Sequence, residues 1–190
     1  MSIPEISQAA FIAPGAAIYG NVVLAEGTSV WFNAVIRAES ASVEIGAFSN
    51  IQDHAMIHIG TVDATRIGAY CSITHHATVH GATVGDHCLI GIGATVMDGA
   101  IVGDNCIVAG HCIVTEGAVI PPNSVVAGVP GKVVARRNNY VDNKVNAYSY
   151  YRNALAYVQG DHRLWSREDY QADLSAARAR YEQDPEAASE

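Results

Sequence analysis

The chain has 190 residues, enough for one domain with a substantial hydrophobic core and a small appendage. Its formal net charge of −8 argues against binding nucleic acid through a basic surface. No apolar run approaches the roughly 20 residues that a membrane span needs, and the N-terminus lacks the basic and apolar regions of a signal peptide. We therefore expect a cytoplasmic protein that binds neither nucleic acid nor a membrane.

Branched aliphatic residues recur every sixth position over most of the chain. A helix has a period of 3.6 and an ordinary strand a period of 2, whereas a period of six with Gly and Asn at the turns indicates stacked β-coils. The series is irregular at three places, with extra residues before Ile45 and Ile67 and one missing before Val84. Its members, here called anchors, are Ile12, Ile18, Leu24, Val30, Ile36, Ile45, Ile51, Ile57, Ile67, Ile73, Val79, Val84, Ile90, Val96, Val102, Val108, Val114, Ile120 and Val126.

From about residue 10 to 135, this repeat resembles that of the hexapeptide-repeat proteins. The resemblance implies a left-handed parallel β-helix with three hexads, about 18 residues, in each triangular coil. We expect this all-β solenoid to occupy residues 1–135 and a helical appendage to occupy residues 136–190. In the appendage, a helix with an apolar stripe of Tyr148, Tyr151, Leu155 and Val158 packs on or beside the solenoid.

A second helix is expected after the break at Gly160. It would start at Ser166, whose spacing to Asp169 suits a capping box, and its apolar stripe would contain Tyr170, Leu174, Ala177 and Tyr181. The four cysteines, Cys71, Cys88, Cys106 and Cys112, each follow an anchor by four residues, a position otherwise held by small residues. They are therefore expected to point inward as reduced, structural thiols.

Counting in hexads places three polar residues in one column. Arg37, His58 and His80 each follow an anchor by one residue, and each lies one coil above the one before it. His75 follows its anchor by two residues and falls on the adjoining face, one coil above Asp53. If three prisms pack around a threefold axis, His75 of one chain can reach the His58/His80 pair of the next. Three imidazoles with an open water position are typical of catalytic zinc.

The other histidines occupy less informative positions. His54, His76, His87 and His111 each follow an anchor by three residues, which is a turn position, so we expect them to be exposed to solvent. His162 lies between the two expected helices and has no visible partner in the sequence.

Two segments closely resemble the γ-class carbonic anhydrases. They are NIQDHAMIH (residues 50–58) and ITHHATVHG (residues 73–81). In that family, the histidine after N-x-Q-D and the outer two of H-x-x-x-x-H bind zinc at the subunit interfaces of a homotrimer. The resemblance therefore implies that His58, His75 and His80 bind Zn²⁺, with His75 donated by a neighbouring chain; Fe²⁺ or Co²⁺ would also suit this ligand set.

Further roles are implied by the same resemblance. Gln52 corresponds to a glutamine near the metal-bound solvent, and Tyr157 to a tyrosine of the C-terminal helix near the active site. VWFNAVIR (residues 30–37) looks like the arginine-bearing segment, so Arg37, Glu39 and Asp53 would form an interface salt-bridge network.

The sequence departs from the family pattern at three places. The usual R-G-D or R-x-D reads Arg37-Ala38-Glu39, and an asparagine two residues after the tyrosine reads Gln159. The founding type carries a proton-shuttle glutamate on a long loop, whereas the loop at residues 60–66 is short and has no glutamate.

The implied function is zinc-dependent, reversible hydration of CO₂ to bicarbonate. One alternative is a catalytically weak or inactive relative that keeps the metal or serves as a scaffold, which the missing glutamate favours. Another is an acyltransferase of the hexapeptide-repeat class, which would share the coil and the closing sequence VAGVPGK (residues 126–132) and could use His111 as its base. Fold analogy alone does not decide between these functions.

Overall fold

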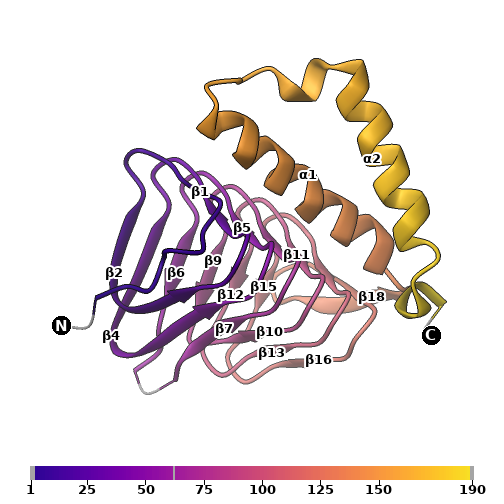
Figure 1. Ribbon diagram of the computed structural model, residues 1–190. Helices are drawn as coiled ribbons and strands as arrows, with labels where there is room; N and C mark the ends of the chain where they lie inside the picture. Colours follow the sequence, from indigo (N-terminus) through magenta and orange to yellow (C-terminus); the bar gives the residue numbers. More distant parts are fainter. Residues whose placement is uncertain (1–2, 62, 189–190) are drawn as a thin grey trace.

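The computed structural model describes residues 3–61 and 63–188 and shows a left-handed parallel β-helix with two helices along one side (Figure 1). One wall, here called the helix face, is an eight-stranded sheet. Its strands in spatial order are β1 (Phe11–Ile12), β3 (Ser29–Val30), β5 (Asn50–Ile51), β8 (Ser72–Ile73), β11 (Leu89–Ile90), β14 (Ile107–Val108), β17 (Ser124–Ala127) and the antiparallel β18 (Lys132–Arg136).

The other two walls are joined because β2 (Ala17–Leu24) and β4 (Val35–Ile45) each run around a corner. The first halves of β2 and β4 continue into the wall here called the histidine face, which comprises β6 (Met56–His58), β9 (Thr78–His80), β12 (Thr95–Val96) and β15 (Ile113–Val114). Their second halves continue into the third face, which comprises β7 (Thr65–Ile67), β10 (Thr83–Val84), β13 (Ile101–Val102) and β16 (Val119–Ile120).

The anchors fill the interior of the prism in vertical ladders. Ile51, Ile73, Ile90 and Val108 stack in register on the helix face, and each is 0 % exposed. Because each short strand pairs with the coils below and above it, backbone hydrogen bonds of 2.7–3.0 Å link successive coils along this face. The six-residue period therefore sets the register of the whole solenoid, and the predicted fold is confirmed.

The cysteines point into this interior, as the hexad position predicts. All four are 0 % exposed and unpaired as disulfides. The thiols of Cys71, Cys88 and Cys106 donate to carbonyl oxygens of the next coil at 3.0–3.2 Å. Burial raises the pKa of the Cys88 thiol, with further contributions from its hydrogen bonds to the two neighbouring thiols. They are structural thiols.

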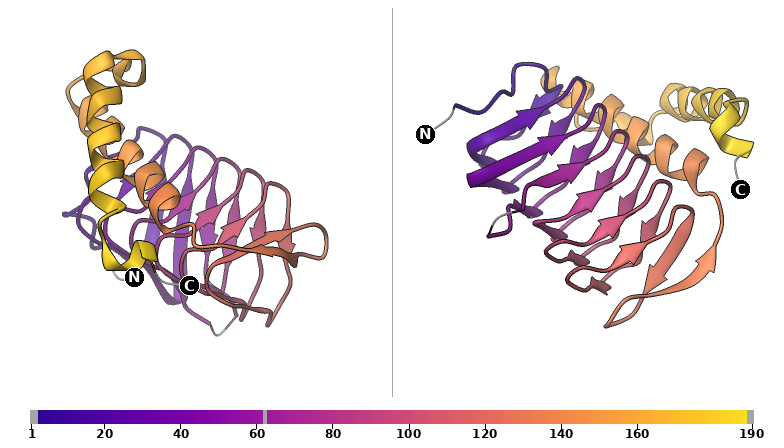
Figure 2. Two further views of the ribbon diagram at one scale, coloured as in Figure 1. Left: turned by 90° about the vertical axis from the view of Figure 1, so that its right-hand side faces the viewer. Right: turned by 90° about the horizontal axis from the view of Figure 1, so that it is seen from below.

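The first helix, α1 (Tyr140–Val158), lies along the helix face (Figure 2). The predicted apolar stripe is only partly confirmed: Tyr151 packs on Phe48 of the solenoid at 5.0 Å between ring centroids, but Leu155 and Val158 are exposed. The buried side instead includes Asn143 and Ala147. The Asn143 amide donates to the carbonyl oxygens of His87 at 2.8 Å and Cys106 at 3.2 Å, and Asn139 donates to Asn105 O at 2.9 Å. The backbone carbonyl oxygens at the corners beneath α1 need hydrogen-bond donors, and the asparagine amides supply them. A hydrophobicity pattern does not reveal this need.

The second helix, α2 (Glu168–Tyr181), packs outside α1 (Figures 1 and 2). It is preceded by the 3₁₀ turn η1 (Leu164–Ser166), and the turn η2 (Pro185–Ala188) follows it. The predicted capping box is wrong, since the N-cap is Arg167 and the Ser166 hydroxyl donates to Arg163 O inside η1. The predicted stripe is confirmed by the burial of Tyr170, Ala177 and Tyr181. Among the described residues, no helix is long and apolar enough to cross a membrane.

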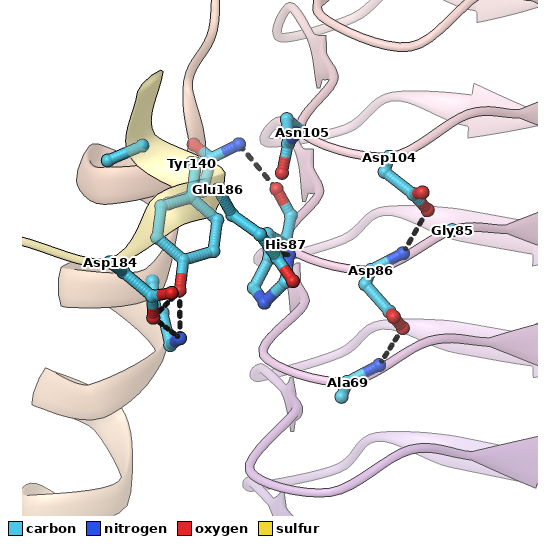
Figure 3. Close-up of polar contacts among 12 residues, drawn as sticks. Ala69, Gly85, Asp86, His87, Asp104, Asn105, Tyr140, Asp184 and Glu186 are labelled. Carbon is cyan, nitrogen blue, oxygen red and sulfur yellow. Dashed lines mark hydrogen bonds and ion pairs between the residues drawn. The ribbon is translucent and has the colours of Figure 1, made fainter. Parts of the chain in front are cut away.

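A cluster of aromatic and charged side chains fastens the C-terminal segment to the solenoid. The Lys144 ammonium lies 4.5–5.1 Å from the ring centroids of Tyr70, Tyr140 and Tyr181, and it pairs with Asp184 at 3.3 Å. Tyr140 also donates to Asp184 (Figure 3). This cluster ties α1, α2 and the corner of the solenoid together.

His87 belongs to this cluster and corrects the expectation that it is exposed. Its ring packs on Tyr140 at 4.6 Å between centroids, and only 9 % of the residue is exposed (Figure 3). Burial lowers the pKa of His87, and the positive charge of Lys144 lowers it further. Asp86, Glu186 and Asp104 act in the opposite direction, but the net shift is downward.

We predict that protonation of His87 weakens the fold in mild acid. Because the pKa in the folded state is depressed, His87 contributes stability that is present above pH ~6.5 and is lost as the pH falls through its folded-state pKa. Asn suits the left-handed backbone at this position, where φ is +53°. In denaturation with urea at one protein concentration, the wild type should lose more unfolding free energy between pH 7 and pH 5 than His87→Asn does.

The matched control is His54→Asn, which removes an exposed histidine at the same kind of turn, with φ +59°. It should keep the pH dependence of the wild type. Parallel pH profiles for the wild type and His87→Asn would contradict this assignment.

Candidate metal centre

The register of the histidine face aligns one arginine and two histidines in a column. Arg37 on β4 pairs with His58 on β6, which pairs with His80 on β9. Side chains at equivalent positions of stacked parallel strands point the same way, so the two imidazoles lie one above the other. Their ring centroids are 5.0 Å apart, and His58 Nδ1 lies 3.0 Å from His80 Nε2.

This separation suits two ligands of one metal ion. Imidazole nitrogens bind Zn²⁺ at 2.0–2.1 Å in tetrahedral geometry, which places two such nitrogens about 3.3 Å apart. The observed 3.0 Å is close to that value. A cavity of about 420 Å³ opens beside the pair, and its lining includes Arg37, Glu39 and both histidines.

Asp98 orients His80, and sequence reasoning missed it. Its Oδ1 lies 2.5 Å from His80 Nδ1, so a proton on Nδ1 leaves the Nε2 lone pair free to bind a metal. Gly81 makes room for this carboxylate, since a Cβ at that position would lie 2.3 Å from Asp98 Oδ1, and φ there is +56°. The hexad count contains the relevant information, because Asp98 follows Val96 by two residues and so lies one coil above the His80-Gly81 pair.

Glu39 completes the surroundings of His58. Its carboxylate forms an ion pair with Arg37 and lies 3.0 Å from His58 Nε2. Partial desolvation acts to raise the pKa of the Glu39 carboxyl, but the hydrogen bond with His58 and the charge of Arg37 outweigh it, so the pKa lies below its ordinary value. Within one chain, Arg37 therefore pairs with Glu39 and not with Asp53.

His75 lies on the corner after β8, on the helix face, as the hexad count predicts. Its Nδ1 is 2.9 Å from Asp53 Oδ2, which leaves Nε2 as the nitrogen available to a metal. Within the described residues, one chain brings together no group of three or more histidine, cysteine or acidic side chains that could hold a metal. Within one chain, the His58/His80 pair and His75 thus lie apart from each other.

Tyr157 lies beside His75 in a second cavity, of about 270 Å³. This cavity is also lined by Asp53, Asn153 and His162, and its walls are the rings of Trp31, Phe32, Tyr150 and Trp165. Burial, with a smaller contribution from the charge of Asp53, raises the pKa of Tyr150 to about 12.

Gln52 is not among the residues lining either cavity. It is 2 % exposed, and its Nε2 donates to Asn50 Oδ1 at 2.9 Å, while Asn50 donates to Ser72 Oγ at 3.0 Å. The Gln52 amide therefore belongs to a buried polar ladder beneath α1. Its Oε1 is the atom left to accept a hydrogen bond.

Three of the turn histidines are exposed, as expected. His54, His76 and His111 have φ values of +56° to +59°, and the rings of His54 and His76 stack at 4.9 Å. All three lie at the corner between the helix face and the histidine face, where His54 directly follows Asp53 and His76 directly follows His75.

Comparisons with known proteins place this chain among the hexapeptide-repeat proteins. The family model "Bacterial transferase hexapeptide (six repeats)" matches residues 81–116. A Bacillus cereus protein described as a candidate acetyltransferase has a solved structure that is 29 % identical, with a TM-score of 0.76, and the match covers 80 % of this chain and 88 % of that one. A hexapeptide transferase family protein from Anaplasma phagocytophilum is 28 % identical, with a TM-score of 0.70 and coverage of 81 % and 89 %.

Relatives found by sequence similarity show which family of hexapeptide-repeat proteins this chain resembles most specifically. "Probable carbonic anhydrase" of Methanocaldococcus jannaschii is 43 % identical over 154 residues, which are 81 % of this chain and 94 % of that protein. "Gamma carbonic anhydrase 1, mitochondrial" of Arabidopsis thaliana is 35 % identical over 50 % of this chain, but the match spans only 37 % of the plant protein. This chain belongs to the γ-class carbonic anhydrase family.

We predict that Asp98→Asn weakens metal binding by about 10–100-fold, because the carboxylate that orients His80 is lost. Competition with a chromophoric chelator measures this affinity. Asp104→Asn is the matched control: the Asp104 carboxylate accepts a hydrogen bond from Asp86 N at 2.8 Å at another corner of the solenoid, and its loss should leave the affinity unchanged. Equal affinities for the wild type and Asp98→Asn would contradict the role of Asp98.

Proposed function

We propose that the chain is a metal-dependent carbonic anhydrase that interconverts CO₂ and bicarbonate. The observation that carries the proposal is the 3.0 Å separation of the His58 and His80 nitrogens, with Asp98 orienting the second ring. Membership of the γ-class carbonic anhydrase family supports the same activity. A divalent metal bound by three neutral imidazoles would supply a water acidified to near neutral pH as the nucleophile.

The third ligand in this proposal is His75 of a neighbouring chain. Its Nε2 is available because Asp53 engages Nδ1. The two parts of the ligand set lie on different faces of a rigid prism, so they complete each other only between copies, and a cyclic trimer closes such an arrangement with three equivalent sites. Zn²⁺ is the preferred ion, and Fe²⁺ or Co²⁺ would also accept three imidazoles and a water.

The remaining residues would position the reactants. Arg37 and Glu39 lie beside the His58/His80 pair, and Asp53 lies beside His75, so in a trimer these charges would meet at the interface. Gln52 is buried and lines neither cavity, so its part would be limited to accepting a hydrogen bond from a water that reaches Oε1. Tyr157 would contact CO₂ or bicarbonate from the cavity that it shares with His75.

Two other functions remain as alternatives with observations of their own. The short loop at residues 60–66 without glutamate favours a relative that binds metal but turns over slowly or serves as a scaffold. The likeness to structures of the transferase class favours acyl transfer, with the exposed His111 as the base. An acyltransferase has no requirement for the aligned His58/His80 pair or for Asp98.

We predict that the purified chain binds about one metal ion per chain and hydrates CO₂, and that His80→Ala abolishes both, because it removes one of three ligands. Metal content is measured by elemental analysis and hydration by stopped-flow with a pH indicator. His111→Asn, which suits the φ of +56°, should keep metal and activity if the proposal holds.

The outcomes separate the candidates. A wild type without stoichiometric metal would refute the site. Full metal content without rate enhancement would favour the scaffold. Acyl transfer from acyl coenzyme A that is lost in His111→Asn and kept in His80→Ala would favour the transferase.

A further inference from the structure

His162 lies in the same cavity as His75, although 87 residues separate them in the sequence and they come from different parts of the fold. His75 is on the solenoid corner after β8, whereas His162 is in the turn between α1 and η1. Aromatic rings form the walls of this cavity, so its polar groups are few: Asp53, His75, Asn153, His162 and the Tyr150 and Tyr157 hydroxyls.

The turn that carries His162 is held by its neighbours. The ring of His162 meets that of Tyr157 edge to face, at 4.5 Å between centroids and an interplanar angle of 88°. Beside it, Asp161 accepts a hydrogen bond from Arg163 N at 2.9 Å and pairs with Arg167 at 3.0 Å. The turn is therefore held in place, and His162 both lines the cavity and is exposed to solvent.

The other groups around His162 are less suited to carrying protons between the cavity and the solvent. Asp53 and His75 are engaged with each other at 2.9 Å. Asp161 is paired with Arg167, and guanidinium and phenol groups such as those of Arg163 and Tyr157 do not readily exchange protons near neutral pH. Imidazole is the side chain that exchanges protons near neutral pH.

We propose that His162 is the proton-transfer group of the reaction proposed above, an inference that rests on the proposed carbonic anhydrase function. Hydration converts CO₂ and H₂O to HCO₃⁻ and H⁺, so each turnover must export one proton. Neutral His162 accepts that proton at its free ring nitrogen, passes it to a buffer base in solution and returns to the neutral form. A liquid water molecule occupies about 30 Å³, so a cavity of about 270 Å³ has room for several waters to link His75 to His162.

His162 would take the place of the proton-transfer glutamate that the loop at residues 60–66 lacks. This role also predicts which kinetic constant depends on His162. Proton export follows the conversion of CO₂, so its loss lowers kcat and leaves kcat/KM unchanged.

The test uses the full chain loaded with Zn²⁺, in the wild type and in His162→Ala. At low buffer concentration and saturating CO₂, the buffer does not carry the proton. Under these conditions His162→Ala should lower kcat by about tenfold or more, while kcat/KM changes less than about twofold. Added imidazole should restore kcat. Arg163→Ala removes the adjacent exposed side chain and is the matched control, with kinetics like those of the wild type.

A readout independent of turnover is the amount of bound metal. Metal content of the variant should equal that of the wild type, since His162 is not a ligand.

The outcomes distinguish this inference from the proposed function. A wild-type protein that holds zinc and does not hydrate CO₂ in any buffer overturns both. An active wild type with an unchanged kcat in His162→Ala at low buffer overturns the role of His162 alone. A loss of kcat that imidazole does not restore, or an equal fall in kcat/KM, also overturns it, because it would indicate a structural role.

Discussion

In-register stacking of the coils is the constraint on which the rest of this molecule depends. Each short parallel strand bonds to the coil below and the coil above it, and the inward anchors exclude any slip of a single residue, which would turn the aliphatic side chains out. Equivalent side chains are therefore held in columns one interstrand spacing apart. A column of two histidines has a fixed nitrogen–nitrogen separation before any metal arrives.

The same constraint explains why one chain holds the proposed ligand set in two parts. His75 follows a strand of the helix face, whereas His58 and His80 end strands of the histidine face, so His75 lies at a different corner of the prism. A rigid prism cannot bend to bring them together. In the proposed site, association between copies would be part of the chemistry, and Arg37 and Asp53 lie beside the two parts that would meet.

Much of this arrangement could be predicted from the six-residue period, because the solenoid is a regular object in which sequence spacing determines spatial position. The Arg37–His58–His80 column and the inward cysteines follow from counting. The positions of residues outside the repeat could not be predicted in this way, because the six-residue spacing does not extend to them. Backbone carbonyl oxygens at the solenoid corners need hydrogen-bond donors, and these determine which side of α1 packs on the solenoid. Asn143 therefore faces the solenoid, and Leu155 is exposed.

Other features depended on contacts between distant segments. His87 reads as an exposed turn residue until α1 covers it, and His162 has no visible partner until the turn after α1 folds back towards His75. Counting in hexads places Asp98 one coil above Gly81, but carboxylates are common at turns. Only the 2.5 Å distance between Asp98 Oδ1 and His80 Nδ1 shows that Asp98 orients the ring.

The central claim, that two copies complete each metal site, is tested most directly by subunit complementation. His75→Ala and His80→Ala alone should each bind little metal. Trimers formed by co-expressing equal amounts of the two variants should regain about a quarter of the wild-type metal, since a site is intact where His58 and His80 of one variant face His75 of the other. Mixed trimers without recovered metal, or full metal content in either single variant, would contradict the claim.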